Sequence, residues 1–426
     1  MIGCTVDAKT KDFLTSLFDA AVAAADPVHA LRNHLPEKPK GRTVVIGAGK
    51  GAAQLAAAFE DLWDGPVEGV VVTRYGYAAP CRSIKVIQAA HPVPDLTGER
   101  ATKDVFAALA GLSSDDLVVA LITGGGSALL AAPPVGLTLS DEAALNEALL
   151  ASGAPISAMN CIRKQASAVK GGRLALAAAP ARVVTLVVSD VPGDDPAQVA
   201  SGPTVPCTKG RAEALAAIRA HNIAIPDRVM DHLKTAPEDA PAPGDPRLAA
   251  NTVTVIASAR RSLEAAAEAA TAQGVSAVIL SDSIEGEARD VGKVHAAIAR
   301  EVASRDRPFV KPVVILSGGE TTVTLRSKGG RGGRNSEFLL SFAQDIDGWD
   351  GIAAMAADTD GIDGSENNAG AFATGASLSQ MRDAGLDPSE ALARNDAWGA
   401  FDSINALFTP GPTGTNVNDF RAILVK

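Results

Sequence analysis

Residues 44–52 have the sequence VVIGAGKGA: a short β-branched run enters a glycine turn, and an alanine-rich helical pattern follows it. A strand that leads through a glycine turn into a helix is the first half of a parallel βα unit. The pattern recurs along the chain, where further apolar runs end in turns at residues 70–76, 117–127 and 183–195. These runs do not alternate with polar residues, as expected of strands that helices cover on both faces. The sequence therefore predicts an α/β fold with a parallel sheet flanked by helices.

The chain is long enough for two domains. Its 426 residues exceed what one ordinary hydrophobic core supports. Four prolines and Gly244 crowd residues 235–246 between two helical patterns, which is typical of a linker. We therefore predict a large N-terminal Rossmann-like domain at 1–240 and a smaller C-terminal α/β domain at 241–426. Short apolar runs predict the strands of the later part of the chain, at residues 253–256, 277–280, 313–316 and 352–357.

Composition and charge exclude several classes of partner. A formal charge of -10 disfavours binding to nucleic acid, which needs a basic face. Residues 7–22 form an amphipathic helical pattern and not a secretory signal, and no run of about 20 apolar residues follows that could cross a membrane. Four scattered cysteines without a CxxC pair predict neither a zinc site nor a disulfide framework. We expect a cytoplasmic protein that binds small molecules, and a homodimer is compatible with the sequence.

The glycine turns predict a site for phosphate groups. Ligands of an open parallel sheet bind outside the carboxyl ends of its strands, which is where these turns lie. Glycine lets backbone N–H groups approach an anion closely, and the helix that follows adds the positive end of its dipole. One such turn alone could equally serve packing. The residues expected to bind phosphate or nucleotide are Gly47, Gly49, Gly51, Gly124, Gly125, Gly126, Ser127, Gly318, Gly319 and Glu320.

An NAD(P)H-dependent reductase is the alternative. Residues 47–52 fit the dinucleotide fingerprint GxGxxA. The acidic residue that would hold the ribose at the end of the second strand is absent, and Thr73 and Arg74 stand there instead. Arg74 would suit a 2′-phosphate, so the reductase stays open. Lys50 is unusual in such a turn, which normally needs only backbone.

Two arginines and several carboxylates accompany these turns. Arg331 and Arg334 lie among four glycines in residues 329–335, a loop that suits a bidentate grip on phosphate or carboxylate. Carboxylates collect in the turns after other apolar runs, and magnesium prefers one or two carboxylates together with phosphate oxygens. Any single aspartate among them could instead cap a helix. The aspartates expected to bind magnesium are Asp190, Asp194 and Asp358.

Taken together, these segments resemble the glycerate 2-kinase family, in which a large N-terminal domain precedes a smaller C-terminal domain of the MOFRL type. The resemblance covers nearly the whole chain and rests on motifs in one order: IGAGKGA at 46–52, AAHPVPD at 89–95, ITGGGSALL at 122–130, MNCIRKQASAVKGGRLA at 159–175, SDVPGDDPAQVASGPT at 189–204, SGGETTVT at 317–324, GGRGGRNSEF at 329–338, AADTDGIDGS at 356–365 and PTGTNVND at 412–419. It implies ATP-dependent transfer of a phosphoryl group to the 2-hydroxyl of D-glycerate, with 2-phosphoglycerate as product and a requirement for Mg²⁺. Lys50 and Arg334 match the functional lysine and arginine of the family. Some relatives carry the name hydroxypyruvate reductase, which is the same alternative that residues 47–52 raise.

These observations suggest a role for each candidate residue. Lys50 and Arg334 would neutralise the migrating phosphoryl group, because a loose transition state asks for positioning and charge more than for covalent chemistry. The turn at residues 124–127 would supply N–H donors. Asp190 would hold magnesium or accept the hydroxyl proton. One of two cations, Arg331 or Lys164, would bind the substrate carboxylate.

Overall fold

The computed structural model describes residues 6–327 and 329–426, and its contacts divide the chain into two compact units. The first unit is Pro27–Ile256, and the second combines the chain up to Asp26 with Ala257–Lys426. The boundary lies later than the expected 240/241, because the strand that follows the proline-rich segment 235–246 still belongs to the first sheet. The N-terminal helix also departs from the expected domain 1–240, since it packs in the second unit.

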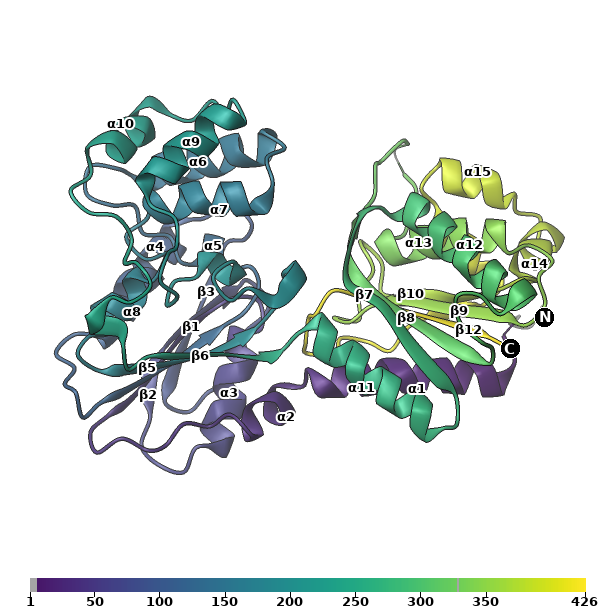
Figure 1. Cartoon of the computed structure of the whole chain (residues 1–426), viewed down its shortest axis with the longest axis horizontal. Coiled ribbons are helices and arrows are strands. Elements are labelled where there is room, and N and C mark those ends of the chain that lie inside the picture. Colours follow the sequence, from purple (N-terminus) through teal and green to yellow (C-terminus); the bar gives the residue numbers. More distant parts are fainter. Residues whose placement is uncertain (1–5, 328) are drawn as a thin grey trace. The chain divides into compact units, whose positions relative to one another are not determined.

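Six strands of the described residues form the sheet of the first unit (Figure 1). The pairings from β3 through β2, β1 and β4 to β5 are all parallel, and β6 lies at the edge beside β5. The predicted parallel α/β architecture is confirmed. In spatial order the strands are β3 (Ile84–Ala89), β2 (Glu68–Arg74), β1 (Thr43–Ala48), β4 (Leu117–Ile122), β5 (Arg182–Val188) and β6 (Thr252–Ala257). Only β3 had not been predicted, because Lys85 and Gln88 interrupt its apolar run.

Helices cover both faces of this first sheet (Figure 1). One face packs against α4 (Leu96–Ala108), α5 (Gly126–Leu129) and α8 (Arg173–Ala178), whereas α2 (Pro27–Arg32) and α3 (Ala52–Leu62) lie on the other. A separate apolar cluster joins four further helices, which are α6 (Leu139–Ala151), α7 (Ile156–Gln165), α9 (Arg211–Ala220) and α10 (Asp227–Thr235). Short 3-10 helices follow β5 and precede β6: η1 (Pro192–Asp194), η2 (Val199–Ser201) and η3 (Pro246–Leu248).

The second unit contains a mixed sheet, also of six strands among the described residues. Its order is β11 (Leu407–Phe408), β10 (Gly370–Thr374), β9 (Ile352–Asp358), β12 (Asp419–Val425), β8 (Val313–Thr322) and β7 (Ser276–Glu287). β7 and β8 are parallel, whereas β12 runs antiparallel to both of its neighbours. The last strand of the chain therefore lies in the middle of the sheet. β8 is longer than the predicted run 313–316, because Gly318 and Gly319 continue the strand and do not form a turn. β7 is also longer than the predicted run 277–280 and pairs with β8 along this extension.

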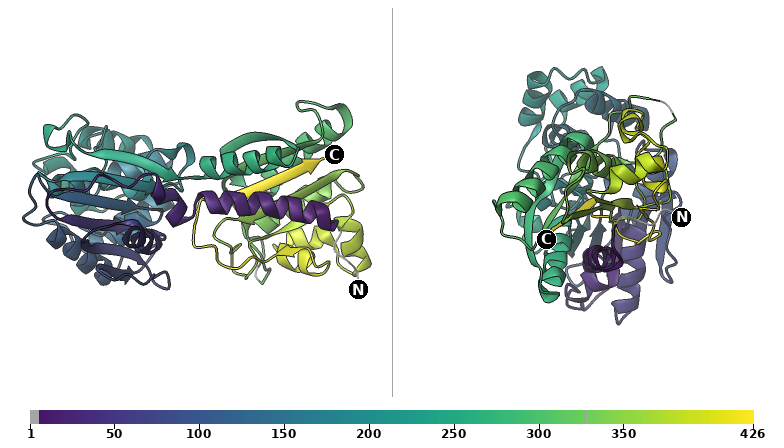
Figure 2. Two further views of the ribbon diagram at one scale, coloured as in Figure 1. Left: turned by 90° about the horizontal axis from the view of Figure 1, so that it is seen from below. Right: turned by 90° about the vertical axis from the view of Figure 1, so that its right-hand side faces the viewer.

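Helices also cover both faces of the second sheet (Figures 1 and 2). The predicted N-terminal amphipathic helix is α1 (Ala8–Ala24), which lies beside α11 (Ala259–Ala272) on one face and buries Leu14, Leu17 and Phe18. The opposite face packs against α12 (Ala288–Arg305), α13 (Arg334–Asp345), α14 (Ser377–Asp383), α15 (Pro388–Ala393) and α16 (Ala397–Asp402). The ends of β8 and β9 and the starts of β12 and α13 are thereby brought to one place.

Two further properties of the chain can be stated for the described residues. No helix among them is both long enough and apolar enough to span a bilayer. Cys161 and Cys207 are buried, Cys81 is half-buried, and all three are free thiols. Cys4 lies outside the described residues.

Candidate active site

Hydrogen bonds within the protein close the turn after β1. The N–H of Gly49 donates to the carbonyl of the neighbouring strand β2 at 3.1 Å, and the N–H of Lys50 donates to the carbonyl of Gly124 at 2.8 Å. The N–H of Gly51 donates to Oγ1 of Thr123 at 3.0 Å. The turn therefore does not present the open row of N–H donors that we expected of Gly49 and Gly51.

Close packing explains the glycines of this turn instead. A Cβ on Gly47 would lie 2.5 Å from the carbonyl oxygen of Leu121 on the adjacent strand β4. Gly49 has a φ of +135°, and a Cβ there would overlap Thr123. Only glycine lets the end of β1 and the end of β4 approach so closely. Gly51 makes ordinary contacts, with its nearest neighbour at 3.6 Å.

Two side chains from separate strand ends meet at the second glycine turn. Gly125 precedes the short helix α5 with a φ of +82°, and a Cβ on it would lie 3.1 Å from Nε2 of His91 and 3.2 Å from Cγ of Lys50. Lys50 follows β1, and His91 follows β3. The half-buried Lys50 side chain forms no ion pair with the part of the chain that the structure describes. Its ammonium is therefore available to a ligand.

Asp190 completes this group from the end of β5. A Cβ on Gly124 would overlap its carboxylate, so a glycine is required for the carboxylate to lie against the end of β4. We call these five residues, Lys50, His91, Gly124, Gly125 and Asp190, the Lys50 cluster. They lie at the carboxyl ends of parallel strands, which is where such sheets bind ligands. Sequence reasoning found four of them and missed His91, because a lone histidine in AAHPVPD shows no partner in sequence.

His91 is neutral near pH 7. Its pKa is lowered from 6.5 to about 4, chiefly by burial and further by the charges of Lys50 and Arg74. Neither ring nitrogen has a hydrogen-bond partner in residues 6–327 or 329–426. The ring therefore presents an uncharged, unpaired nitrogen beside the Lys50 side chain.

Ser127 and Gly126 face inward in the same turn. Oγ of Ser127 lies 2.8 Å from Oγ of Ser201, which donates onward to Oδ1 of Asn160 at 3.1 Å. A Cβ on Gly126 would lie 2.6 Å from the Cβ of Ala200. These residues join the turn to the segment after β5, so the expected phosphate contact of Ser127 would compete with a hydrogen bond that the protein already makes.

Lys164 is a buried cation in the same unit. It lies on α7 and is only 4% exposed. Burial lowers the pKa of its ammonium, and the nearby Cys207 and Asp195 oppose that effect. The described residues offer this ammonium neither an ion pair nor a hydrogen bond. A cation on a residue so little exposed suits an anionic ligand.

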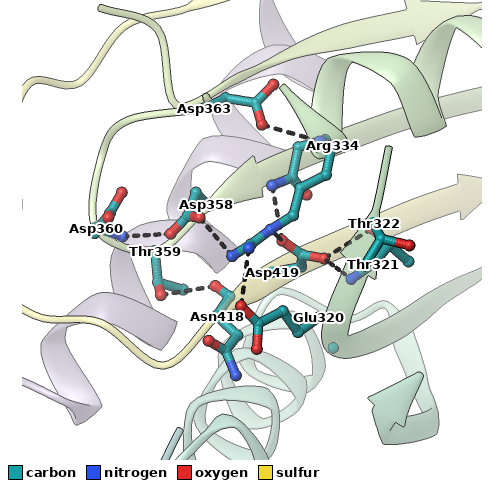
Figure 3. A network of polar contacts seen from close by, with 12 residues as sticks. Glu320, Thr321, Thr322, Arg334, Asp358, Thr359, Asp360, Asp363, Asn418 and Asp419 are labelled. Atoms are coloured by element: carbon teal, nitrogen blue, oxygen red, sulfur yellow. Dashed lines mark hydrogen bonds and ion pairs between the residues drawn. The ribbon is translucent and has the colours of Figure 1, made fainter. Parts of the chain in front are cut away.

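Arg334 lies in the second unit. Its guanidinium lies between three carboxylates (Figure 3): Nε donates to Asp419 at 2.6 Å, Nη2 to Asp358 at 2.8 Å, and Nη1 to Glu320 at 3.1 Å. Asp419 also accepts from Asn335 and pairs with the fully buried Arg421. The side chains of Asp419 and Asp358 are 0% and 8% exposed, whereas that of Glu320 is 51% exposed. Nη1 is therefore the edge of the guanidinium that faces outward.

Burial and charge compete within this network. Burial alone would lower the pKa of Arg334, but Asp419, Asp358 and Glu320 outweigh it and hold that pKa above its usual range. Burial would raise the pKa of Asp419, but Arg421 and Arg334 hold it below its ordinary value. Burial raises the pKa of Asp358 well above its ordinary value, and Arg334 only partly opposes this. Arg334 is thus a permanently charged group in a fixed orientation.

Protein groups occupy the N-terminus of α13 and surround Gly319 in β8. Asp363 accepts the N–H groups of Asn335 at 3.0 Å and Ser336 at 2.8 Å, so a carboxylate of the protein already occupies the N-terminus of α13. Gly318 and Gly319 lie inside β8, where a Cβ on Gly319 would overlap the backbone of β7. These two glycines thus belong to a strand and not to a turn, and their phosphate-binding role stays a prediction.

Arg331 is held by an aromatic ring. Its guanidinium carbon lies 3.9 Å from the ring centroid of Trp398, and its N–H donates to Asp396 at 3.3 Å. The side chain is exposed. Of the two cations considered for the substrate carboxylate, Arg331 thus belongs to the second unit with Arg334, and Lys164 belongs to the first unit with the Lys50 cluster.

The three aspartates considered for magnesium are divided between the two units. Asp190 and Asp194 belong to the first unit and Asp358 to the second, where it is paired with Arg334. Among the described residues, no three histidine, cysteine or carboxylate side chains are grouped as a metal site requires. Magnesium prefers one or two carboxylates plus phosphate oxygens, so Asp190 in the Lys50 cluster fits this ion better than Asp358 does.

Comparison with known proteins places this geometry in a family. Residues 13–234 match the family described as a domain of unknown function (DUF4147), and residues 313–419 match the MOFRL family. Glycerate 2-kinase of Pyrococcus horikoshii is 37% identical over 432 residues, which cover 96% of each chain. The crystal structure of glycerate kinase from Thermotoga maritima superposes with a TM-score of 0.90 at 34% identity, covering 99% of this chain and 100% of that one. The chain belongs to the glycerate kinase family.

Names within the glycerate kinase family are not uniform. A protein of Agrobacterium vitis that is provisionally named hydroxypyruvate reductase is 51% identical to this chain over 421 residues, which cover 98% of this chain and 95% of the relative. D-glycerate 2-kinase of Thermotoga maritima is 36% identical over 411 residues. Family membership therefore makes this chain an enzyme of the glycerate kinase family, while the more similar relative carries the reductase name.

Proposed function

We propose that this enzyme transfers the γ-phosphoryl group of ATP to the 2-hydroxyl of D-glycerate and releases 2-phosphoglycerate. The observation that carries the proposal is the closed turn at Lys50. The N–H groups of Lys50 and Gly51 donate to residues that follow β4, whereas the ammonium of Lys50 has no ion pair among the described residues. In a turn built in this way, the ammonium is available to a phosphate, whereas the backbone N–H groups are already hydrogen-bonded.

The same observation disfavours the NAD(P)H-dependent hydroxypyruvate reductase. In the dinucleotide fold, backbone N–H groups of the glycine turn and the following helix bind the pyrophosphate. The corresponding N–H groups of Lys50 and Gly51 are already bonded to Gly124 and Thr123. Arg74, the residue that would favour a 2′-phosphate, stacks on the ring of Tyr77 at 4.1 Å. The fingerprint in the sequence is thus better explained by strand packing.

Charge neutralisation is the chemistry we assign to Lys50 and Arg334. Phosphoryl transfer passes through a loose transition state whose charge spreads over the equatorial oxygens, so fixed cations lower its energy. The ammonium of Lys50 would bind these oxygens directly. For Arg334 we assign this role to Nη1, whose partner Glu320 is exposed.

The substrate and the metal ion would be held by separate residues. Lys164 is our preferred partner for the carboxylate of glycerate, because its ammonium is unpaired among the described residues and belongs to the same unit as Lys50. Arg331 is less suitable, since it stacks on Trp398. Asp190 would hold Mg²⁺, which supplies charge neutralisation to the phosphates when bound. A cytoplasmic location and a homodimer remain predictions.

One paired assay tests the proposed function. The enzyme is given D-glycerate with MgATP in one reaction and hydroxypyruvate with NADPH in the other, and ADP and the nicotinamide absorbance are followed. The proposal expects ADP formation that depends on glycerate, and no oxidation of NADPH. Oxidation of NADPH without ADP formation would establish the reductase instead.

A further inference from the structure

His91 is the member of the Lys50 cluster to which the proposed function gives no role. Its Nε2 and the Cγ of Lys50 both lie close to Gly125. They are 3.1 and 3.2 Å from the position that a Cβ on Gly125 would occupy. The ring is half-buried, and no residue in the described ranges forms a hydrogen bond with either ring nitrogen. The open nitrogen therefore suits a ligand that brings a hydrogen-bond donor.

The charges that act on His91 are cationic. Lys50 comes from the turn after β1 and Arg74 from the end of β2. Together with burial they keep the ring uncharged at neutral pH, and a neutral imidazole carries a lone pair on one of its nitrogens. Phosphate groups bound beside Lys50 would offset this positive field. Such an offset would make the ring a better proton acceptor in the loaded enzyme than in the free one.

We propose that Nε2 of His91 accepts the proton of the substrate hydroxyl during phosphoryl transfer, an inference that rests on the proposed function. The hydroxyl oxygen forms a bond to the γ-phosphorus, and the bond from the γ-phosphorus to the bridging oxygen breaks. ADP leaves with the electron pair of that bond, while the hydroxyl proton passes to Nε2. The imidazolium then returns its proton to water, which restores the neutral ring.

This assignment divides the work between His91 and Asp190. Both residues border the same glycine turn, His91 at Gly125 and Asp190 at Gly124. A carboxylate is a good ligand for Mg²⁺, whereas a neutral imidazole beside an ammonium is not favoured by this hard cation. We therefore assign the proton to His91 and the metal to Asp190. The hydroxyl would then lie within hydrogen-bond reach of Nε2, as a general base requires.

Chemical rescue tests the inference. His91→Ala should lower kcat with D-glycerate and MgATP on the order of 10²- to 10⁴-fold, which is the usual contribution of general-base catalysis. KM for MgATP should change little. Free imidazole should then restore turnover in proportion to the concentration of its neutral form. A merely structural role for His91 would not produce this pH-dependent rescue.

Two controls keep the outcomes distinct. His221→Ala removes an exposed histidine at the end of α9 and should leave kcat unchanged with or without imidazole. If wild-type enzyme forms no ADP, the proposed function fails, whereas near-normal kcat of His91→Ala in an active background overturns only the role of His91. Absence of rescue in a folded His91→Ala variant also overturns it. Should that variant unfold, His91→Gln provides the kcat comparison, and near-normal turnover by it would contradict the inference.

Discussion

Arg334 donates through Nε to Oδ1 of Asp419 over 2.6 Å, and the other oxygen of that carboxylate pairs with the fully buried Arg421. One carboxylate of the second unit therefore binds two guanidinium groups. Asp419→Asn would leave Arg421 buried without its charge partner, and we expect it to lower the free energy of unfolding by about 3–5 kcal/mol. Urea denaturation measures this directly.

Glu320→Gln is the matched control for Asp419→Asn, because it removes a carboxylate from the exposed edge of the same Arg334. Exposed ion pairs contribute little, so the loss should stay below about 1 kcal/mol. Equal losses in the two variants would show that Asp419 does not carry the buried charge of Arg421.

Lys50→Ala removes the ammonium that we assign to the phosphoryl group. We expect kcat to fall on the order of 10²-fold or more while the midpoint of urea unfolding changes little, since the side chain makes no ion pair among the described residues. Steady-state turnover of D-glycerate with MgATP measures the effect, and Arg334→Ala should show a comparable loss of kcat. Lys38→Ala, at an exposed pair with Asp64, serves as control. Near-normal kcat in Lys50→Ala would refute the role of this residue.

Gly125→Ala tests whether activity requires the space beside Gly125 that His91 and Lys50 occupy, in addition to the left-handed backbone conformation of this residue. The new Cβ would press on His91 and Lys50 at 3.1 and 3.2 Å, so both side chains would be displaced. We expect kcat to fall at least about 10-fold, because small misplacements of reacting groups are costly.

Gly136→Ala separates the two effects in Gly125→Ala. Its φ of +92° resembles the +82° of Gly125, but a Cβ there would meet nothing within 4 Å. Both variants pay a backbone penalty of about 1 kcal/mol for the left-handed conformation. Only Gly125→Ala should lose activity, and a similar loss in Gly136→Ala would attribute the effect to the backbone alone.

His295 should make stability depend on pH. Its ring nitrogens contact Val291 O at 2.8 Å and Ser317 Oγ at 3.0 Å, and burial lowers its pKa from 6.5 to about 4. Because the folded pKa is depressed, the stabilisation is complete above pH 6.5 and is lost progressively as the pH falls toward 4. When the pH falls from about 8 to about 5, this one group should lower the free energy of unfolding of the wild type by about 2 kcal/mol.

His295→Gln checks this pH dependence, since glutamine does not titrate. The difference in unfolding free energy between the two pH values should be smaller in the variant than in the wild type. His91 and His232 have lowered pKa values as well and remain in both proteins, so they cancel in the comparison. An unchanged difference would mean that His295 protonates freely in the folded state.

The apolar runs of the first sheet could be predicted from sequence because their residues carry the information locally. Val44, Val45 and Ile46 are buried on both faces and pass directly into a glycine turn. β12 could not be found in this way. It contains Asp419 and Arg421, which are buried because they neutralise each other, and Asp419 also pairs with Arg334. Such pairing depends on the fold and leaves no pattern along the chain.

The candidate site likewise combines features that the sequence marks locally with features that depend on the fold. Glycine turns mark the ends of β1 and β4 in sequence, but their role as close-packed joints depends on Leu121 and Thr123 in a neighbouring strand. His91 carries no local signal, since its position beside Gly125 exists only after β3 has paired with β2. Gly318 and Gly319 resemble a turn in sequence but form part of β8, where the close approach of β7 to Gly319 requires a residue without a side chain.

Phosphorus NMR of the product tests the central claim most directly. The enzyme is incubated with D-glycerate and MgATP until ADP accumulates, and the phosphomonoester is assigned by its coupling to the proton on the carbon that bears it. We predict a doublet from the single proton at carbon 2, which identifies 2-phosphoglycerate. A triplet from the two protons at carbon 3, or no phosphomonoester at all, would contradict the proposed function.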